Sequence, residues 1–140
     1  MGETLIIRVD PRFPGVWSIL QPYIKLALGR SGAYRDWVEE DVYQAVIEGR
    51  CILWALIHDG AVFGAVVSTE IHYPRRKVID VTLMGADPNT EAQWLKCVET
   101  FKRMAKAAGA DCLTATGRDG WSRKLGADRQ RIVFEIDLGD

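Results

Sequence analysis

The sequence has few cysteines, and their arrangement does not resemble a metal site. Cys51, Cys97 and Cys112 lie far apart, with no C-x-x-C pair and no Cys/His spacing of the kind that tetrahedral zinc requires. We therefore predict three free thiols in a reducing cytoplasm and no bound metal. Disulfides are not needed for folding either, because a chain of 140 residues can bury a substantial core.

The sequence also lacks an excess of charge of one sign and a long apolar run. Its 18 Lys and Arg residues balance 19 Asp and Glu residues, so a broad basic face for nucleic acid is not expected. No apolar run approaches the roughly 20 residues that span a bilayer, and the first ten residues have no secretory-signal pattern. The composition, 48% hydrophobic and 26% charged, predicts one globular domain over residues 1–140 with no membrane partner.

Apolar periodicity predicts a chain that mixes strands and helices. Spacings of three and four residues favour helices, strict alternation favours strands, and Asp59-Gly60 is typical of a tight hairpin turn. The expected strands are 4–9, 51–58, 61–70, 77–84, 111–116 and 130–138, and the expected helices are 14–30, 37–48, 89–108 and 121–125.

Single residues are expected to shape the predicted helices. Asp36 is the expected N-cap of the second helix, and Asn89 or Thr90 that of the long third helix. Pro22 is expected to kink or divide the first helix. The order β-α-α-β-β-β-α-β-α-β predicts an α/β (α+β) fold, in which helices flank a mixed, mostly antiparallel sheet of about six strands.

This order of elements, over nearly the whole chain, resembles the GNAT superfamily of acyl-CoA N-acyltransferases. The most informative segment is 117–127, Gly-Arg-Asp-Gly-Trp-Ser-Arg-Lys-Leu-Gly-Ala, which resembles the short helix and Lys-Leu-Gly-Phe-like turn before the last strand of that family. Together with Trp94 and Gly109, the segment is similar to a divergent group of small GNAT-like proteins encoded by tailed bacteriophages.

The resemblance implies a binding site for acetyl-CoA. In the family, the central strand splays from the next strand at a bulge, and its free N–H and C=O groups bind the pantetheine arm. The pyrophosphate lies at the N-terminus of the long helix, where free N–H groups favour an anion. In this sequence the strand would be 78–84. The implied cofactor-binding residues are Val81, Leu83, Met84, Gly85, Ala86, Asn89 and Thr90.

The expected pyrophosphate loop departs from the family pattern. Members commonly have Gln or Arg, two residues, Gly, one residue, and then Gly or Ala, whereas the segment 84–90 has a single glycine. Asp87 repels an anion, and Pro88 has no N–H to donate. Ser122 occupies the place of a tyrosine that reprotonates the leaving thiolate in many members, and serine is too short for that reach. We therefore predict a degenerate pyrophosphate loop.

Glu70, His72 and Asp80 are the candidate catalytic residues. Acyl transfer to an amine needs a carboxylate or an imidazole that takes the ammonium proton, directly or through water. Polar residues also occupy solvated strand ends without any catalytic role. The basic residues of 75–77 and 118–131 have two interpretations, phosphate capture or solvated loop charge, and the second is favoured.

Two functions are therefore kept open. The first is an N-acyltransferase that transfers an acetyl group from acetyl-CoA to an amine of a small molecule or a protein. The alternative is a catalytically inactive GNAT-like scaffold that acts as a phage virion-associated or interaction protein, with phage structural proteins as partners, in the host cytoplasm or the virion. A nucleic-acid-binding module depends only on the arginine clusters and is the least favoured.

Overall fold

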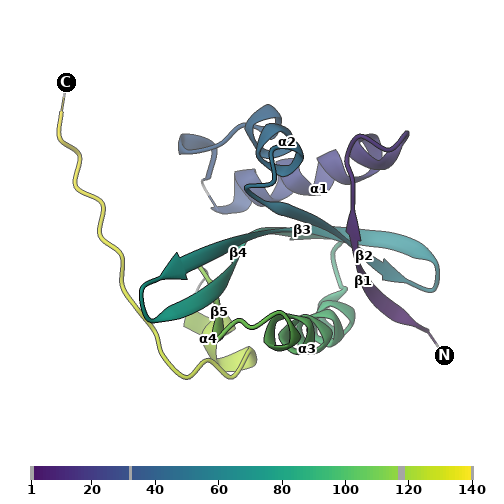
Figure 1. Cartoon of the computed structure of the whole chain (residues 1–140). Helices are drawn as coiled ribbons and strands as arrows, with labels where there is room; N and C mark the ends of the chain where they lie inside the picture. The colour runs from purple at the N-terminus through teal and green to yellow at the C-terminus, as the bar shows by residue number, and fades with distance from the viewer. Residues whose placement is uncertain (1, 32, 117–118, 140) are drawn as a thin grey trace.

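The computed structural model describes residues 2–31, 33–116 and 119–139, and it contains one five-stranded sheet in the order β1-β2-β3-β4-β5 (Figure 1). Strands β1 to β4 pair antiparallel, and β5 pairs parallel to β4. The mixed, mostly antiparallel sheet predicted from the sequence is thus confirmed. The strands are β1 (Thr4–Val9), β2 (Ile52–His58), β3 (Ala61–Tyr73), β4 (Arg76–Ala86) and β5 (Cys112–Ala115).

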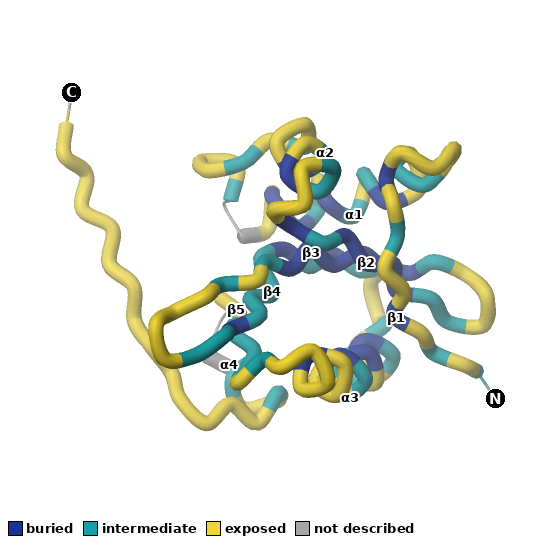
Figure 2. The backbone as a smooth tube through the Cα atoms, in the orientation of Figure 1, coloured by how far each residue is buried: buried dark blue, intermediate teal, exposed yellow. Residues whose placement is uncertain are grey.

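Helices cover both faces of the sheet. The helices α1 and α2 lie on one face, and α3 and α4 lie on the other (Figure 1). The deepest burial follows the middle of the sheet and the helix sides that face it (Figure 2). No helix of the described part of the chain is long and apolar enough to cross a membrane. The helices are α1 (Val16–Ser31), the 3-10 turn η1 (Ala33–Arg35), α2 (Glu39–Ile47), α3 (Glu91–Ala107) and α4 (Asp119–Lys124).

Each face of the sheet has its own apolar cluster. Leu20, Ile24 and Leu28, at helical spacing along α1, are at most 2% exposed against the first face. Trp94 and Phe101 of α3 are buried against the second face. Because β2 lies between the two clusters, both of its faces are covered, as its almost continuous apolar sequence predicts.

Pro22 does not divide α1, which is one helix from Val16 to Ser31, because packing of its opposite side against the sheet outweighs the loss of one backbone hydrogen bond. The expected N-cap of α2 was wrong. Asp36 does not cap α2. The N-cap position is Val38, whose N–H donates to the Asp41 carboxylate at 3.0 Å from inside the first turn.

Both hairpins of the sheet contain a register shift, between Leu56 and Ile57 in the β2–β3 pair and between Val67 and Ser68 in the β3–β4 pair. Asp59 and Gly60 both have positive φ, 51° and 78°, as the predicted tight turn between β2 and β3 requires. In the β3–β4 pair, Val67 faces Leu83 while Ser68 faces Val81. Thr82 is therefore the extra residue of a β-bulge in β4.

The predicted sixth strand, 130–138, is absent, so the described sheet has five strands. After α4 the chain is extended and leaves the body of the molecule (Figure 1). Ile132, Phe134 and Ile136 are about four-fifths exposed, at 80%, 83% and 79%. The alternating pattern specifies an extended conformation, but a strand forms only where a neighbouring strand supplies hydrogen bonds, and this segment meets none.

Candidate functional site

The strands β4 and β5 part after four paired positions. Their ladder begins at Val78 opposite Cys112 and ends at Val81 opposite Ala115. Beyond Val81, β4 continues to Ala86 with no strand of the described residues on its β5 side. The bulge at Thr82 lies where the two strands part. The edge of β4 from Thr82 to Ala86 thus presents main-chain donors and acceptors that pair with neither β5 nor any other described strand.

Asp80 lies where the strands part and is held by two hydroxyl groups. Thr114 Oγ1 of β5 donates to Asp80 Oδ1 at 2.7 Å, and Thr82 Oγ1 donates to Asp80 Oδ2 at 3.0 Å. Thr82 Oγ1 lies 2.6 Å from Thr69 Oγ1, which lies 3.5 Å from Cys51 Sγ. These hydrogen bonds form a series that links Cys51, in the apolar cluster beneath α1 and α2, to the half-buried carboxylate of Asp80.

The carboxylate at one end of this series decides which group donates in each of its hydrogen bonds. An ionised carboxylate only accepts, so the single hydroxyl proton of Thr82 is used on Asp80. Thr69 must then donate to Thr82, and the Cys51 thiol must donate to Thr69. The series holds the Asp80 carboxylate in one orientation and supplies donors to both of its oxygens.

Glu70 and His72 lie on the opposite face of the sheet from Asp80. Glu70 follows Thr69 in β3, and consecutive strand residues point to opposite faces. Glu70 Oε1 lies 2.7 Å from His72 Nε2 and 3.2 Å from Lys77 Nζ. The hydrogen bond from Lys77 holds the pKa of Glu70 below its usual range, with a smaller contribution from His72. The structure therefore pairs two of the three predicted catalytic residues with each other and separates them from the third.

The loop from β4 to α3 is short and acidic. Asp87 N–H donates to the carbonyl of Phe63 at 2.8 Å, and Thr90 Oγ1 donates to the carbonyl of Asp87 at 2.7 Å. Thr90 occupies the N-cap position of α3, as predicted, but its side chain does not cap the helix. Asn89 has φ of 64°, which turns the chain into the helix. The N–H groups of the first turn of α3 consequently have no side-chain cap.

A lysine from α4 reaches the start of α3. Lys124 Nζ lies 3.0 Å from Glu91 Oε1 and 4.5 Å from the centre of the Trp121 ring. Trp121 packs against Trp94 with ring centres 4.8 Å apart, which fixes α4 beside α3. Lys124 is about half exposed and places a positive charge beside this helix start.

The helix α1 lies directly over the end of β4. A Cβ atom on Gly85 would overlap the carbonyl group of Tyr23, so only glycine allows this approach. The Tyr23 hydroxyl lies 3.5 Å from the carbonyl of Val62. Burial raises the pKa of Tyr23, and the neighbouring Asp87 carboxylate raises it further. Gly85 is thus a packing position that seats α1 against the same strand that carries the free edge.

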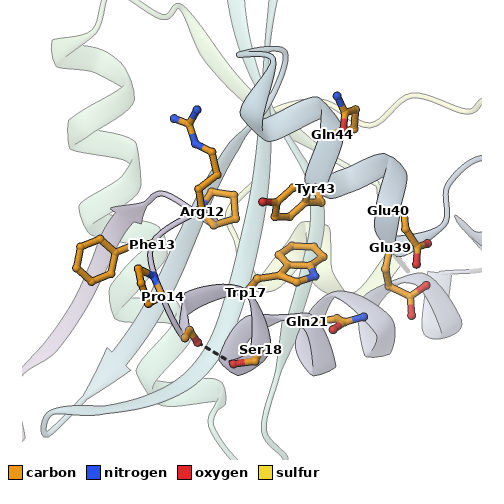
Figure 3. A pocket seen from close by; sticks show the side chains of 12 residues that line it. Arg12, Phe13, Pro14, Trp17, Ser18, Gln21, Glu39, Glu40, Tyr43 and Gln44 are labelled. Atoms are coloured by element: carbon orange, nitrogen blue, oxygen red, sulfur yellow. Dashed lines mark hydrogen bonds between the residues drawn. The ribbon is translucent and has the colours of Figure 1, made fainter.

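A separate open groove of about 620 Å³ lies between the β1–α1 connection and α2 (Figure 3). The Trp17 and Tyr43 rings meet edge to face at 5.1 Å in its wall. Glu39 and Glu40 add carboxylates, and the guanidinium of Arg12 is held by Asp10 at 2.9 Å. Aromatic faces and carboxylates suit a cationic ligand, although the sequence analysis did not identify this groove.

Two residues of the basic cluster 75–77 form contacts within the molecule. Lys77 Nζ donates to the carbonyl of Ala108 at 2.7 Å, and Arg76 lies over the Tyr73 ring and donates to Cys112 Sγ. These cations stabilise the hairpin and the end of α3. Residues 117 and 118, which belong to the family-like segment and to the second basic cluster, lie outside the described residues.

The sequence analysis missed Thr69, Thr82 and Thr114, the hydroxyl groups around Asp80. One signal was readable, because residues 80 and 82 lie two apart in a predicted strand and so share a face. The contributions of Thr69 and Thr114 depend on strand register. The described residues include no group of three or more His, Cys, Asp or Glu placed to hold a metal ion.

Comparison with known proteins gave likeness in structure and none in sequence. No family model and no curated protein matches the chain. An aminoglycoside acetyltransferase from an uncultured soil metagenomic sample matches with a TM-score of 0.71 and 14% identity, over 98% of this chain and 99% of that one. Another soil metagenomic aminoglycoside acetyltransferase, solved with sisomicin, matches with a TM-score of 0.68 and 10% identity, over 97% of each chain.

The aminoglycoside N-acetyltransferase AAC(6')-Iy, solved in complex with CoA, matches with a TM-score of 0.64 and 13% identity, over 99% of this chain and 97% of that one. At these identities the likeness concerns the fold alone. The chain has the fold of the GNAT superfamily of acetyltransferases.

Proposed function

We propose that this chain is an N-acetyltransferase that transfers the acetyl group of acetyl-CoA to an amine. The observation that carries the proposal is the free edge of β4 with an oriented carboxylate, Asp80, where that edge begins. An extended chain such as a pantetheine arm can pair with a free strand edge through main-chain hydrogen bonds. Residues 1–140 would form this enzyme as one domain.

The cofactor site would follow β4 to the start of α3. The edge beyond Val81, formed by Leu83, Met84, Gly85 and Ala86, would hold the pantetheine arm. Main-chain N–H groups that follow Asn89 and Thr90 would face the pyrophosphate, because the first turn of α3 has no side-chain cap. Lys124 would add a positive charge beside that turn.

The acidic loop would limit the affinity of this site. Asp87 and Glu91 flank the same helix start, and a carboxylate repels a pyrophosphate. Lys124 pairs with Glu91, and within the part of the chain that the structure describes Asp87 forms no ion pair with a cation. We therefore infer that the loop is degenerate and that acetyl-CoA binds more weakly than in a chain with a glycine-rich loop.

Asp80 would act as the general base. When bound, acetyl-CoA supplies a thioester-activated acetyl group. Asp80, directly or through a water molecule, would take the proton from the acceptor ammonium and release the lone pair that forms the new amide bond. Thr82 and Thr114 would keep the carboxylate in position during this transfer. As the thioester C–S bond breaks, the thiolate of CoA would take its proton from solvent, because the Ser122 side chain is too short to supply it.

The acceptor would enter from the α1–α2 side of the sheet. Asp80 is hydrogen-bonded to Thr82 and through it to Thr69 and Cys51, and Cys51 belongs to the apolar cluster beneath α1 and α2. A small-molecule amine is the favoured acceptor class, because matched structures of this fold are aminoglycoside acetyltransferases. A protein amine is the other acceptor class that the sequence left open.

A second candidate is a GNAT-like scaffold that does not bind acetyl-CoA. The observation that favours it is the pair of acidic residues, Asp87 and Glu91, at the start of α3. The structural likenesses do not bear on the bacteriophage resemblance or on a virion location. Those two features remain predictions from the sequence.

Calorimetry and thermal unfolding with acetyl-CoA, CoA and pantetheine separate the two candidates. A ligand at 100 times its Kd adds about 2.7 kcal/mol to the stability of the folded form. We expect a higher Tm with acetyl-CoA and CoA, and a smaller shift with pantetheine, which lacks the pyrophosphate. No shift at millimolar acetyl-CoA would rule out the acetyltransferase and leave the scaffold.

A further inference from the structure

The open groove of about 620 Å³ between the β1–α1 connection and α2 is separate from the free edge of β4 (Figure 3). Its walls come from residues 11–15, from the first turns of α1 and from the first turns of α2, and no strand lines it. The hydrogen-bonded series that holds Asp80 shares no residue with the groove. A ligand in this groove is therefore not a ligand of the site proposed for acetyl transfer.

The β1–α1 connection is held in one conformation by its own hydrogen bonds. The main-chain N–H of Arg12 donates to Asp10 Oδ1 at 2.9 Å, and Arg12 Nε donates to the same oxygen at 3.0 Å. Phe13 N–H donates to the carbonyl of Asp10 at 3.1 Å. Phe13 is consequently fixed at the groove although it is 70% exposed. A single exposed ring is ordinary, but Phe13, Trp17 and Tyr43 line one groove and make a continuous aromatic surface.

The opposite wall of the groove carries two carboxylates without a cation beside them. Glu39 and Glu40 lie in the first turn of α2, where Asp41 already supplies the carboxylate that caps the helix. Among the residues that the structure describes, neither Glu39 nor Glu40 forms an ion pair. Arg12 also lines the groove, but Asp10 neutralises it at 2.9 Å. The groove therefore keeps a negative charge that a cationic ligand would balance.

The aromatic rings favour an organic cation over a metal ion. Trp17 and Tyr43 meet at an angle of 73°, and the ring that supplies its edge keeps its own faces free of this contact. A cation over such a face is attracted by the negative charge of the π-system. A metal ion would need several ligand atoms, and the described residues include no group of three His, Cys, Asp or Glu placed to hold one.

We propose that this groove binds an organic cation, an ammonium group carried on an aromatic or aliphatic body. The ammonium group lies between the Trp17–Tyr43 pair and Glu40, and the apolar body lies against Phe13 and Pro14 (Figure 3). The volume of the groove is within the roughly 300–1,000 Å³ of small-molecule sites. The inference does not depend on acetyl transfer. A quaternary ammonium, which has no N–H and no lone pair and cannot accept an acetyl group, fits the same site.

Titration of the ¹⁵N-labelled full chain with benzyltrimethylammonium, without acetyl-CoA, is the first test. At millimolar concentration the probe should shift the amide signals of 12–18 and 39–44 and the indole N–H of Trp17, and leave those of 80–86 unchanged. Phenylacetate, which carries the same ring with a negative charge, is the matched control and should shift none of them. Shifts confined to 80–86, equal shifts with phenylacetate, or no shift with the cation would overturn the proposal. A failure to bind acetyl-CoA would leave this result unchanged.

Two variants of the groove are the second test. Glu40→Gln removes a charge and Phe13→Ala removes a ring, and both side chains are exposed, so the variants should fold as the parent does. Each should weaken binding of benzyltrimethylammonium by about tenfold. Glu99→Gln, which alters an exposed carboxylate of α3 that pairs with Lys102, is the matched control and should bind as the parent does. Unchanged affinity in either groove variant, or an equal loss in Glu99→Gln, would contradict this site.

Discussion

The Asp80 carboxylate accepts a hydrogen bond from the Thr114 hydroxyl at 2.7 Å. The two residues face each other in the next-to-last pair of the β4–β5 ladder. One rung later the strands separate, so the same two residues that hold the strands together also place a carboxylate at the start of the free edge. A side chain that is anchored from both strands is oriented more firmly than one at a strand end. This relationship singles out Asp80 among the three candidate bases.

Asp80→Asn should abolish most acetyl transfer and leave acetyl-CoA binding nearly unchanged. The amide keeps the size of the side chain but cannot take a proton, and loss of a general base lowers kcat by about 10²–10⁴-fold. The measurement is thiol release from acetyl-CoA with a panel of small amines, together with Kd by calorimetry. Glu70→Gln, on the opposite face of the sheet, is the control and should stay within a few-fold of the parent. Equal losses in both variants would remove Asp80 from this role.

Gly85→Ala should destabilise the fold by about 1–3 kcal/mol, because the added methyl group meets the backbone of Tyr23 and forces α1 away from β4. Urea unfolding followed by circular dichroism gives the change in midpoint. Gly29→Ala in α1 is the matched control. Its nearest neighbour would be Tyr34 Cε2 at 3.9 Å, so the variant should be neutral or slightly more stable. An unaffected Gly85→Ala would show that α1 does not lie this close to β4.

Ser68→Ala should cost about 1–3 kcal/mol, although it removes only one oxygen atom. Trp54 Nε1–H donates to Ser68 Oγ at 2.8 Å in the interior, and the variant leaves that donor buried without a partner. Ser18→Ala, an exposed serine in α1, should change the free energy of unfolding by less than about 0.5 kcal/mol. Chemical denaturation of both variants makes the comparison, and equal effects would contradict the buried hydrogen bond.

The thiols should react in a fixed order. Burial raises the pKa of Cys97 from its ordinary value of 9.0 to about 11, so its thiolate is scarce at pH 8. Ellman's reagent at pH 8 should modify the half-exposed Cys112 first and should reach Cys97 only after denaturation. Rapid modification of native Cys97 would show that its side chain is accessible.

The same thiol should make stability fall at high pH. The unfolded thiol ionises near pH 9, while the folded one resists ionisation up to about pH 11. Its contribution is therefore complete below pH 9 and is lost as the pH rises through 11. Cys97→Ala removes this titration, so the stability difference between parent and variant should shrink over that window in urea unfolding. A constant difference would exclude the thiol as the cause.

Much of the architecture was readable from local patterns. The β-prone run in 4–9, stopped by Asp10-Pro11, predicted β1 at its observed bounds, and Asp59-Gly60 predicted the hairpin turn. The free edge of β4 was expected only through the resemblance to the GNAT superfamily. The N-cap of α2 was not predicted. The N-cap is Val38 instead of Asp36, and the Asp41 carboxylate at the third helical position accepts a hydrogen bond from the Val38 N–H.

The sequence by itself determined the order and type of the elements, because helical and strand periodicities are properties of neighbouring residues. It also placed Glu70, His72 and Asp80 near one another along the chain. Only the tertiary structure decided that Asp80 points to the opposite face of the sheet from the other two and meets Thr69 and Thr114, since face and register depend on a bulge and on pairing between distant strands. The same reason explains the C-terminal segment, whose alternating pattern specifies a strand but cannot specify its partner.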